Sequence, residues 1–307
     1  MPIPQPTTRS GRVVLVGAGP GDAGLITLRG RERIVQADEI LYDYLVNPAI
    51  LEAARADCEI HCLGQHGTSR SSVRAERLWT QEAINQRLIE SARAGRMVVR
   101  LKSGDPAIFG RLAEECAVLD EAGVPYEIVP GITAALAAGP YAGVWITHRD
   151  AASAVALVTG HEKAGQVESK LDFAALAAFP GTLVFYMGVT TARTWSSALI
   201  DAGKSPATPV VVVRRCSWPD QRIVRSTLAQ VADDLEVAKI RPPVISVVGA
   251  DASIADGSAT ARWFVERPLF GQKILTTRPA GLNDSLTKPL SELVGMLYAA
   301  DDPHRAA

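Results

Sequence analysis

The sequence predicts an α/β protein with two α/β domains, whose sheets are mostly parallel and mixed. Apolar strand-like runs alternate with helical stretches along most of the chain, and a second series of them begins near Gly131. A βαβα order is typical of a largely parallel sheet that helices cover on both faces. With 307 residues, of which 47% are hydrophobic and 21% charged, the chain is long enough to form two cores.

The first domain is predicted by five strand-like runs and three amphipathic stretches. The strands are expected at 12–18, 38–43, 58–64, 96–106 and 125–131. The helices, in which apolar residues recur every three or four positions, are expected at 25–37, 79–95 and 110–123.

The second domain repeats this rhythm after a hinge at Pro130 and Gly131. Strands are expected at 154–160, 181–188, 208–215 and 242–250, and helices at 190–203 and 226–238. We therefore expect a disordered lead at 1–11, an N-terminal domain at 12–130, a C-terminal domain at 131–267 and a separate tail at 268–307.

Charge and composition exclude several function classes. The formal net charge is −1, which gives no reason to expect nucleic acid or an anionic membrane as a partner. No apolar run approaches the roughly 20 residues that span a bilayer. The N-terminus lacks the apolar core of a signal peptide, and four cysteines in a chain of this size suggest reduced thiols. We expect a cytoplasmic protein.

The loop after the first strand, VGAGPGD at 16–22, has features of a nucleotide-binding turn. Gly17 and Gly19 fit the dinucleotide fingerprint, and Asp43 stands where a ribose-binding carboxylate would lie. Asp22 replaces the third glycine, however, and Pro20 lacks an N–H that could bind a diphosphate. The loop favours a ligand without phosphates, with an NAD(P)-dependent dehydrogenase as the alternative.

Two further loops follow predicted strands and carry similar residues. RLKSGDPAIFGR, at 100–111, has Gly and Pro at its crest beside Asp105, and VPGITAALAAG, at 129–139, is rich in small residues. Ligands of open α/β sheets bind at the carboxyl ends of the strands. Together the three loops predict one elongated cleft.

The stretch CEIHCLGQH contains residues that can bind zinc. In a strand, however, the period of two places His61 on the face opposite Cys58 and Cys62, which then lie about 13 Å apart. That distance is too long for one tetrahedral ion. We expect no metal.

Six motifs in this order, VGAGPGD, RLKSGDPAIFGR, VPGITAA, ITHRD, LVTGH and LVFYMG, resemble those of the tetrapyrrole methylase family over residues 12–267. They are most similar to the members that methylate uroporphyrinogen III. The resemblance implies two α/β domains, a homodimer, and S-adenosylmethionine in the cleft between the domains. It also implies two methyl transfers to pyrrole carbons of uroporphyrinogen III, which give precorrin-2 for sirohaem or cobalamin synthesis.

The resemblance also assigns residues by their place in these motifs. It casts Asp43 as the base that takes a proton from the substrate, although the pattern by itself does not separate a base from a ribose ligand. Cys216 lies where relatives often have Gly. The cofactor-binding residues that carry over are Pro20, Ser103, Gly104, Asp105, Ile108, Thr133, Ala134, Met187 and Cys216.

The chain departs from the family pattern after the third strand. Relatives commonly have a Lys-Arg pair there, with the Lys proposed as a proton donor, whereas this chain has Gln65 and His66. Gln cannot donate a proton at neutral pH. Three alternatives are open: the step needs no donor, His66 or solvent supplies the proton, or activity is weakened.

The segment 67–81 is longer than usual and basic. Arg70, Arg74 and Arg77 are spaced by four and three residues, so they share one face if the segment is helical. The bland interpretation is a solvated loop. The functional one is a flap that binds carboxylates of the substrate.

The tail resembles the opening strand and helix of uroporphyrinogen-III synthase, in FGQKILTTRPAGLNDSLTKPLSELVG. Too few residues follow Phe270 to form a core. We expect loose packing and no synthase activity. For the whole chain the alternatives are another precorrin C-methyltransferase of the corrin pathway and a tetrapyrrole-binding module with weakened catalysis.

Overall fold

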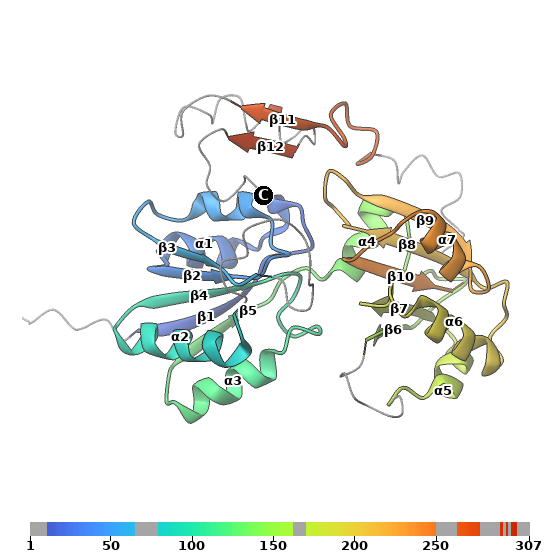
Figure 1. Cartoon of the computed structure of the whole chain (residues 1–307), viewed down its shortest axis with the longest axis horizontal. Coiled ribbons are helices and arrows are strands. Elements are labelled where there is room, and N and C mark those ends of the chain that lie inside the picture. The colour runs from blue at the N-terminus through green and yellow to red at the C-terminus, as the bar shows by residue number, and fades with distance from the viewer. Residues whose placement is uncertain are drawn as a thin grey trace, which may run out of the picture. The chain divides into compact units, whose positions relative to one another are not determined.

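The computed structural model describes residues 11–64, 79–161, 170–249, 263–276, 289–290, 293 and 296–299 (Figure 1). The chain divides into two compact units, of which the first ends at Thr133 and the second begins at Ala134. Each unit contains a five-stranded sheet, so the predicted α/β class is confirmed. Within the described residues, no helix is both long and apolar enough to cross a bilayer.

The first unit has an all-parallel sheet in the order β3-β2-β4-β1-β5. Its strands are β1 Arg12–Gly17, β2 Glu39–Tyr42, β3 Glu59–Cys62, β4 Met97–Lys102 and β5 Tyr126–Val129. Its helices are α1 Leu28–Gln36, α2 Gln81–Arg93 and α3 Leu112–Glu121, with short 3₁₀ helices at Ala23–Leu25 and Pro48–Ala53.

Helices cover both faces of this sheet, which explains why its central strand β1 is apolar without alternation (Figure 1). Val14 and Val16 pack towards α1, whereas Val13 and Leu15 pack towards α2 and α3. The carboxyl ends of all five strands therefore lie at one edge of the sheet, which is where the predicted loops emerge.

The second unit has a mixed sheet in the order β6-β7-β10-β8-β9, in which the neighbours β6 and β7 pair in parallel and the other neighbouring strands pair antiparallel. Its strands are β6 Val155–Thr159, β7 Thr182–Tyr186, β8 Pro209–Arg214, β9 Arg222–Thr227 and β10 Val244–Val248. Its helices are α4 Ala134–Ala142, α5 Phe173–Ala178, α6 Ala192–Asp201 and α7 Val231–Val237.

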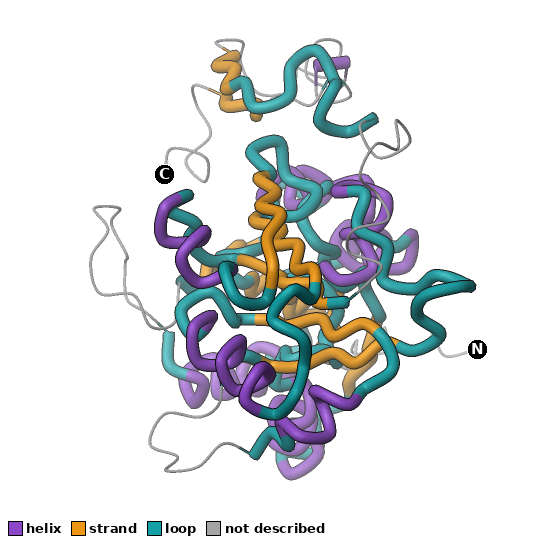
Figure 2. Tube along the Cα trace, turned by 90° about the vertical axis from the view of Figure 1, so that its right-hand side faces the viewer, coloured by secondary structure: helices purple, strands orange, loops and turns teal. Residues whose placement is uncertain are grey.

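The core of the second unit lies between its sheet and α5, α6 and α7. Figure 2 shows helices (purple) lying against strands (orange). Trp195 of α6 is buried and stacks on Phe185 of β7, with ring centroids 4.6 Å apart. Trp195 also donates a hydrogen bond to the carbonyl oxygen of Gly188, so its polar edge is satisfied.

Three element predictions are wrong in this unit. Ser226 and Thr227 end strand β9, and the helix predicted from 226 starts only at Val231. The stretch from Ala134, predicted as a loop, forms α4, and α5 lies in a stretch where no helix is expected. The edge strand β9, RIVRST, is half-exposed and contains two arginines, so its apolar signal is weak.

Beyond the second sheet, the strand predicted at the start of the tail is present as β11, Lys273–Thr276. It pairs in parallel with β12, Met296–Ala299.

Candidate functional site

Three strand-exit loops of the first unit are joined by hydrogen bonds. β1 lies between β4 and β5, so the loops that follow these strands are neighbours. The Gly19 amide donates to the Gly104 oxygen at 3.1 Å, and the Gly104 amide donates to the Gly19 oxygen at 2.8 Å. The Gly131 amide donates to Oδ2 of Asp105 at 2.9 Å. The loops thus form one continuous rim. The cleft expected at these loops stays a prediction.

Glycine is required where these loops touch. A Cβ on Gly17 would lie 2.6 Å from the Cα of Gly131, and a Cβ on Gly131 would lie 2.2 Å from the Gly104 oxygen. Gly19 and Gly104 also have positive φ angles, +76° and +70°. Backbone therefore packs directly on backbone, and the rim offers main-chain rather than side-chain groups.

Five amides of this rim already donate hydrogen bonds within the protein. Besides Gly19, Gly104 and Gly131, the Gly24 amide donates to Asp22 and the Ala107 amide to Asp105, each at 2.8 Å. A diphosphate-binding turn needs free N–H groups and no adjacent carboxylate. The donor set therefore fits a ligand without phosphates, such as a sulfonium nucleoside, better than a dinucleotide.

Asp43 lies directly after β2, beside this rim. Its amide donates to the Leu101 oxygen at 3.1 Å, which continues the β2–β4 ladder by one residue. Its Oδ1 accepts a hydrogen bond from Nη2 of Arg100 at 2.6 Å, and 34% of its side chain is exposed. The carboxylate is thus held by a buried cation and is still accessible.

The remaining predicted residues of the first unit lie along the same rim. Pro20 and Thr133 are buried, and Ser103 and Ile108 are half-buried. The Ile108 amide donates to the Asp105 oxygen, so this residue belongs to the turn that Asp105 closes.

In the second unit, the predicted residues follow strand ends or open a helix. Ala134 begins α4, whose next amide, that of Ala135, donates to the hydroxyl of Tyr186 at 3.0 Å. Met187 follows β7 and is 46% exposed, whereas Cys216 follows β8 and is buried. Burial raises the pKa of the Cys216 thiol to about 12, so it is no nucleophile at neutral pH.

Backbone strain is concentrated at these loops. Six described non-glycine residues have positive φ, and four of them are or flank predicted site residues. Strain of this kind persists where the surrounding structure enforces it, often at functional sites. The four are Phe109, Met187, Arg215 and Ser217.

Comparison with known proteins agrees with the motifs. The tetrapyrrole (corrin/porphyrin) methylases match residues 12–232. The chain belongs to the tetrapyrrole methylase family.

Its relatives include methyltransferases of known name. The chain is 40% identical over 285 residues to the uroporphyrinogen-III C-methyltransferase of Bacillus subtilis, covering 92% of this chain and 56% of that protein. It is 44% identical over 239 residues to an S-adenosyl-L-methionine-dependent uroporphyrinogen III methyltransferase of Methanosarcina barkeri, covering 78% of this chain and 91% of that one. The chain spans about half the length of most of the curated relatives it matches.

A solved structure is also similar. The uroporphyrin-III C-methyltransferase of Thermus thermophilus in complex with S-adenosylhomocysteine aligns with a TM-score of 0.66 and 37% identity. The alignment covers 78% of this chain and 98% of that protein.

Several residues that the sequence singles out in this methylase lie outside the described residues. They are Gln65, His66, Arg70, Arg74 and Arg77.

Three charged residues next to Asp43 are not predicted from the sequence. Arg100, Lys102 and Glu115 are all buried, and Arg100 contacts Asp43 directly. A signal for them exists, because two cations interrupt the otherwise apolar strand MVVRLK.

Cys58 and Cys62 are not part of a metal-ligand cluster within the described residues. Three other side chains of this region do lie close together. Ligand atoms of Glu39, Glu59 and His61 lie within 4.8 Å of one another. Arg87 and Arg96 both contact the two carboxylates at 2.6 to 2.9 Å, so cations already occupy this group. We interpret it as an ion-pair network.

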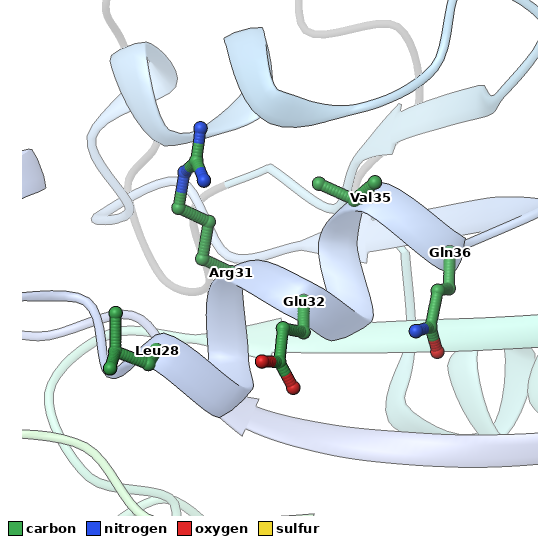
Figure 3. Close-up of a pocket in the computed structure, with 5 residues that line it drawn as sticks. All are labelled: Leu28, Arg31, Glu32, Val35 and Gln36. Atoms are coloured by element: carbon green, nitrogen blue, oxygen red, sulfur yellow. The ribbon is translucent and has the colours of Figure 1, made fainter.

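A surface hollow of about 340 Å³ lies along the outer side of α1 (Figure 3). None of the predicted site residues lines it. The lining residues are Leu28, Arg31, Glu32, Val35 and Gln36.

Proposed function

We propose that this methylase transfers two methyl groups from S-adenosylmethionine to pyrrole carbons of uroporphyrinogen III and so makes precorrin-2. The observation that carries the proposal is the joined rim of three strand-exit loops, five of whose amides already donate within the protein, with the accessible Asp43 beside it. The names of the Bacillus and Methanosarcina relatives support the same reaction. Sirohaem and cobalamin synthesis are the two pathways that use this product.

The cofactor-binding residues are proposed from the family motifs. S-adenosylmethionine supplies a methyl group that its sulfonium already activates, so the protein has to align the reactants and accept a proton. The donor set of the rim fits such a cofactor, and the T. thermophilus complex with S-adenosylhomocysteine supports it. The residues that would hold it are Pro20, Ser103, Gly104, Asp105, Ile108, Thr133, Ala134, Met187 and Cys216.

Asp43 is proposed as the base. The pyrrole carbon that gains a methyl group already bears a side chain and has no hydrogen, so its methylation leaves the substrate cationic. Neutrality returns when a proton leaves the ring nitrogen or a neighbouring bridging carbon. An ionised carboxylate is a sufficient acceptor for it. Asp43 offers an accessible carboxylate that an arginine fixes at one oxygen.

The remaining proposals concern the substrate, the assembly and the tail. Arg70, Arg74 and Arg77 would bind substrate carboxylates by charge. We propose that the protein is cytoplasmic and forms a homodimer. Light scattering of the purified chain tests the dimer. The synthase-like tail is proposed to have no activity of its own, since two paired strands such as β11 and β12 bury too little surface to fold alone.

Mass analysis of the product tests the function. The purified chain is incubated with uroporphyrinogen III and S-adenosylmethionine, and two added methyl groups are expected. Methylation of a later corrin precursor but not of uroporphyrinogen III would favour another precorrin methyltransferase. Binding of S-adenosylhomocysteine without any added methyl would favour a binding module.

A further inference from the structure

Four charged side chains form one connected group that starts at Asp43 and runs into the first unit. Arg100 donates through Nη2 to Asp43 at 2.6 Å and through Nε to Oε1 of Glu115 at 3.2 Å. The other oxygen of Glu115 accepts from Nζ of Lys102 at 2.9 Å. Two positive and two negative groups therefore alternate, and the chain of contacts is neutral as a whole.

The fold places these groups on one face of the sheet. Arg100 and Lys102 are two residues apart on β4, so both side chains point to the face that α2 and α3 cover. Glu115 lies in the first turn of α3 and reaches between them. Asp43, at the end of the neighbouring strand β2, is the member that reaches the surface.

The stability of the fold does not explain why these charged side chains are buried. The side chains of Arg100, Glu115 and Lys102 are at most 4% exposed. Buried ion pairs often contribute nothing relative to apolar residues of the same size, because removal from water is costly. Burial opposes the charge of Arg100, yet Asp43 and Glu115 outweigh it and raise the pKa of the guanidinium. Burial and the Arg100 charge lower the pKa of Lys102.

We propose that Arg100 is a positioning residue for Asp43, and that Glu115 and Lys102 hold Arg100 in place. This proposal rests on the proposed function, in which Asp43 is the base. The guanidinium is fixed at three points, because its Nη1 also donates to the Leu101 oxygen at 3.2 Å. It therefore anchors Oδ1 of Asp43, and within the described residues Oδ2 has no hydrogen-bond partner and is left for the substrate proton.

The arrangement makes a specific prediction about Arg100. If the residue acts through Asp43, its loss lowers kcat and leaves the binding of cofactor and substrate nearly unchanged. In a variant that already lacks the Asp43 carboxylate, the loss of Arg100 lowers kcat no further. This is the behaviour of two residues that act as one unit. The pair Glu115–Lys102 remains balanced in such a double variant.

The test is a double-mutant cycle on the full chain with Arg100→Met, Asp43→Asn and the combined variant. We expect Arg100→Met to lower kcat at least 30-fold, with the Michaelis constant and the affinity for S-adenosylhomocysteine within threefold of wild type. The combined variant should match Asp43→Asn within twofold. Arg100→Lys keeps the charge but cannot contact both carboxylates, so it should recover part of the lost rate and remain folded.

Arg96→Met is the matched control. Arg96 also contacts two carboxylates, those of Glu39 and Glu59, but it lies at the opposite end of β4. We expect it to lower the unfolding temperature and leave kcat within twofold. Additive losses in the cycle, or an Arg100→Met enzyme as active as wild type, would overturn the positioning role. A wild-type chain that adds no methyl would instead refute the proposed function.

Discussion

Asp43 illustrates how this fold combines a polar site with an apolar sheet. The residue stands one position past the buried end of β2, so its backbone is fixed by the ladder while its side chain reaches solvent. Its partner Arg100 is buried within β4, where Asp43 and Glu115 are the carboxylates that neutralise it among the described residues. The position of a single carboxylate is thus set by residues of two strands and a helix.

Replacing Asp43 by Asn separates the two roles that the sequence leaves open. If Asp43 is the base, methylation falls at least about 100-fold because the proton acceptor is lost. The affinity for S-adenosylhomocysteine, measured by calorimetry, stays within about twofold, since the amide keeps the shape and can still contact Arg100. An affinity that falls in proportion to the rate would identify Asp43 as a ribose ligand.

Gly131→Ala tests the close contact between the three loops. The new Cβ would lie 2.2 Å from the Gly104 oxygen and 2.7 Å from the Gly17 Cα, and these backbone atoms cannot move aside without opening the rim. We expect a loss of about 3 kcal/mol in the free energy of unfolding and at least tenfold weaker binding of S-adenosylhomocysteine.

The control is Gly123→Ala. Gly123 has a φ of +65° and no atom within 4 Å of the added Cβ, so only the backbone conformation is strained, by about 1 kcal/mol. Urea unfolding measures the free energy of unfolding of both variants. If the two bind the cofactor equally well, the rim is not part of the binding site.

At the scale of elements, the sequence predicts the elements that have a clear apolar pattern and misses those that depend on tertiary contacts. β1 and β8 are read correctly because runs such as VVLV and VVVV suit only a strand buried on both faces. The helix α4, AALAAGPYA, lacks an amphipathic pattern, and its Gly139 and Pro140 are signals of a loop. The role of Arg100 depends on Glu115, which is brought to it only by the packing of α3.

The contact between α1 and β5 gives stability that depends on pH. Arg33 of α1 donates two hydrogen bonds to Glu127 of β5, at 2.8 and 3.1 Å, and thereby lowers the pKa of that carboxyl. A carboxyl with a lowered folded-state pKa stabilises the protein above its unfolded pKa, about 4.3, and loses this contribution as pH falls through the folded value.

Arg33→Gln should therefore lower the free energy of unfolding by about 1 kcal/mol at pH 7, and the difference from wild type should shrink below about pH 3. Urea titrations at both pH values measure it. The control Arg193→Gln removes an ion pair to Asp233 in which both side chains are more than half exposed, and it should cost less at either pH. Equal losses for Arg33→Gln at pH 7 and pH 3 would contradict the assignment.

At the scale of the whole chain, the second compact unit includes residues on both sides of Arg267. Phe264 is buried and packs edge-on against Tyr141 at 4.7 Å, and Trp263 donates to the Pro140 oxygen. The Gly271 amide donates to the Pro219 oxygen at 2.9 Å. Residues 263–271 therefore belong to the packing of the second unit, while β11 and β12 form a separate small sheet.

The low net charge of the chain bears on how it attracts its substrate. The chain as a whole is nearly neutral, at −1, so a polycarboxylate substrate is attracted only where arginines gather. Changing Arg70, Arg74 and Arg77 together to Gln should raise the Michaelis constant for uroporphyrinogen III about tenfold, because each exposed charge pair contributes up to about 1 kcal/mol. The constant for S-adenosylmethionine should hardly change.

The control changes the exposed Arg31, Arg93 and Arg222 to Gln, which alters the net charge equally. If both triple variants raise the Michaelis constant for uroporphyrinogen III equally, the effect comes from total charge and the segment 67–81 has no binding role. If the effect is local to this segment, it also diminishes at high salt.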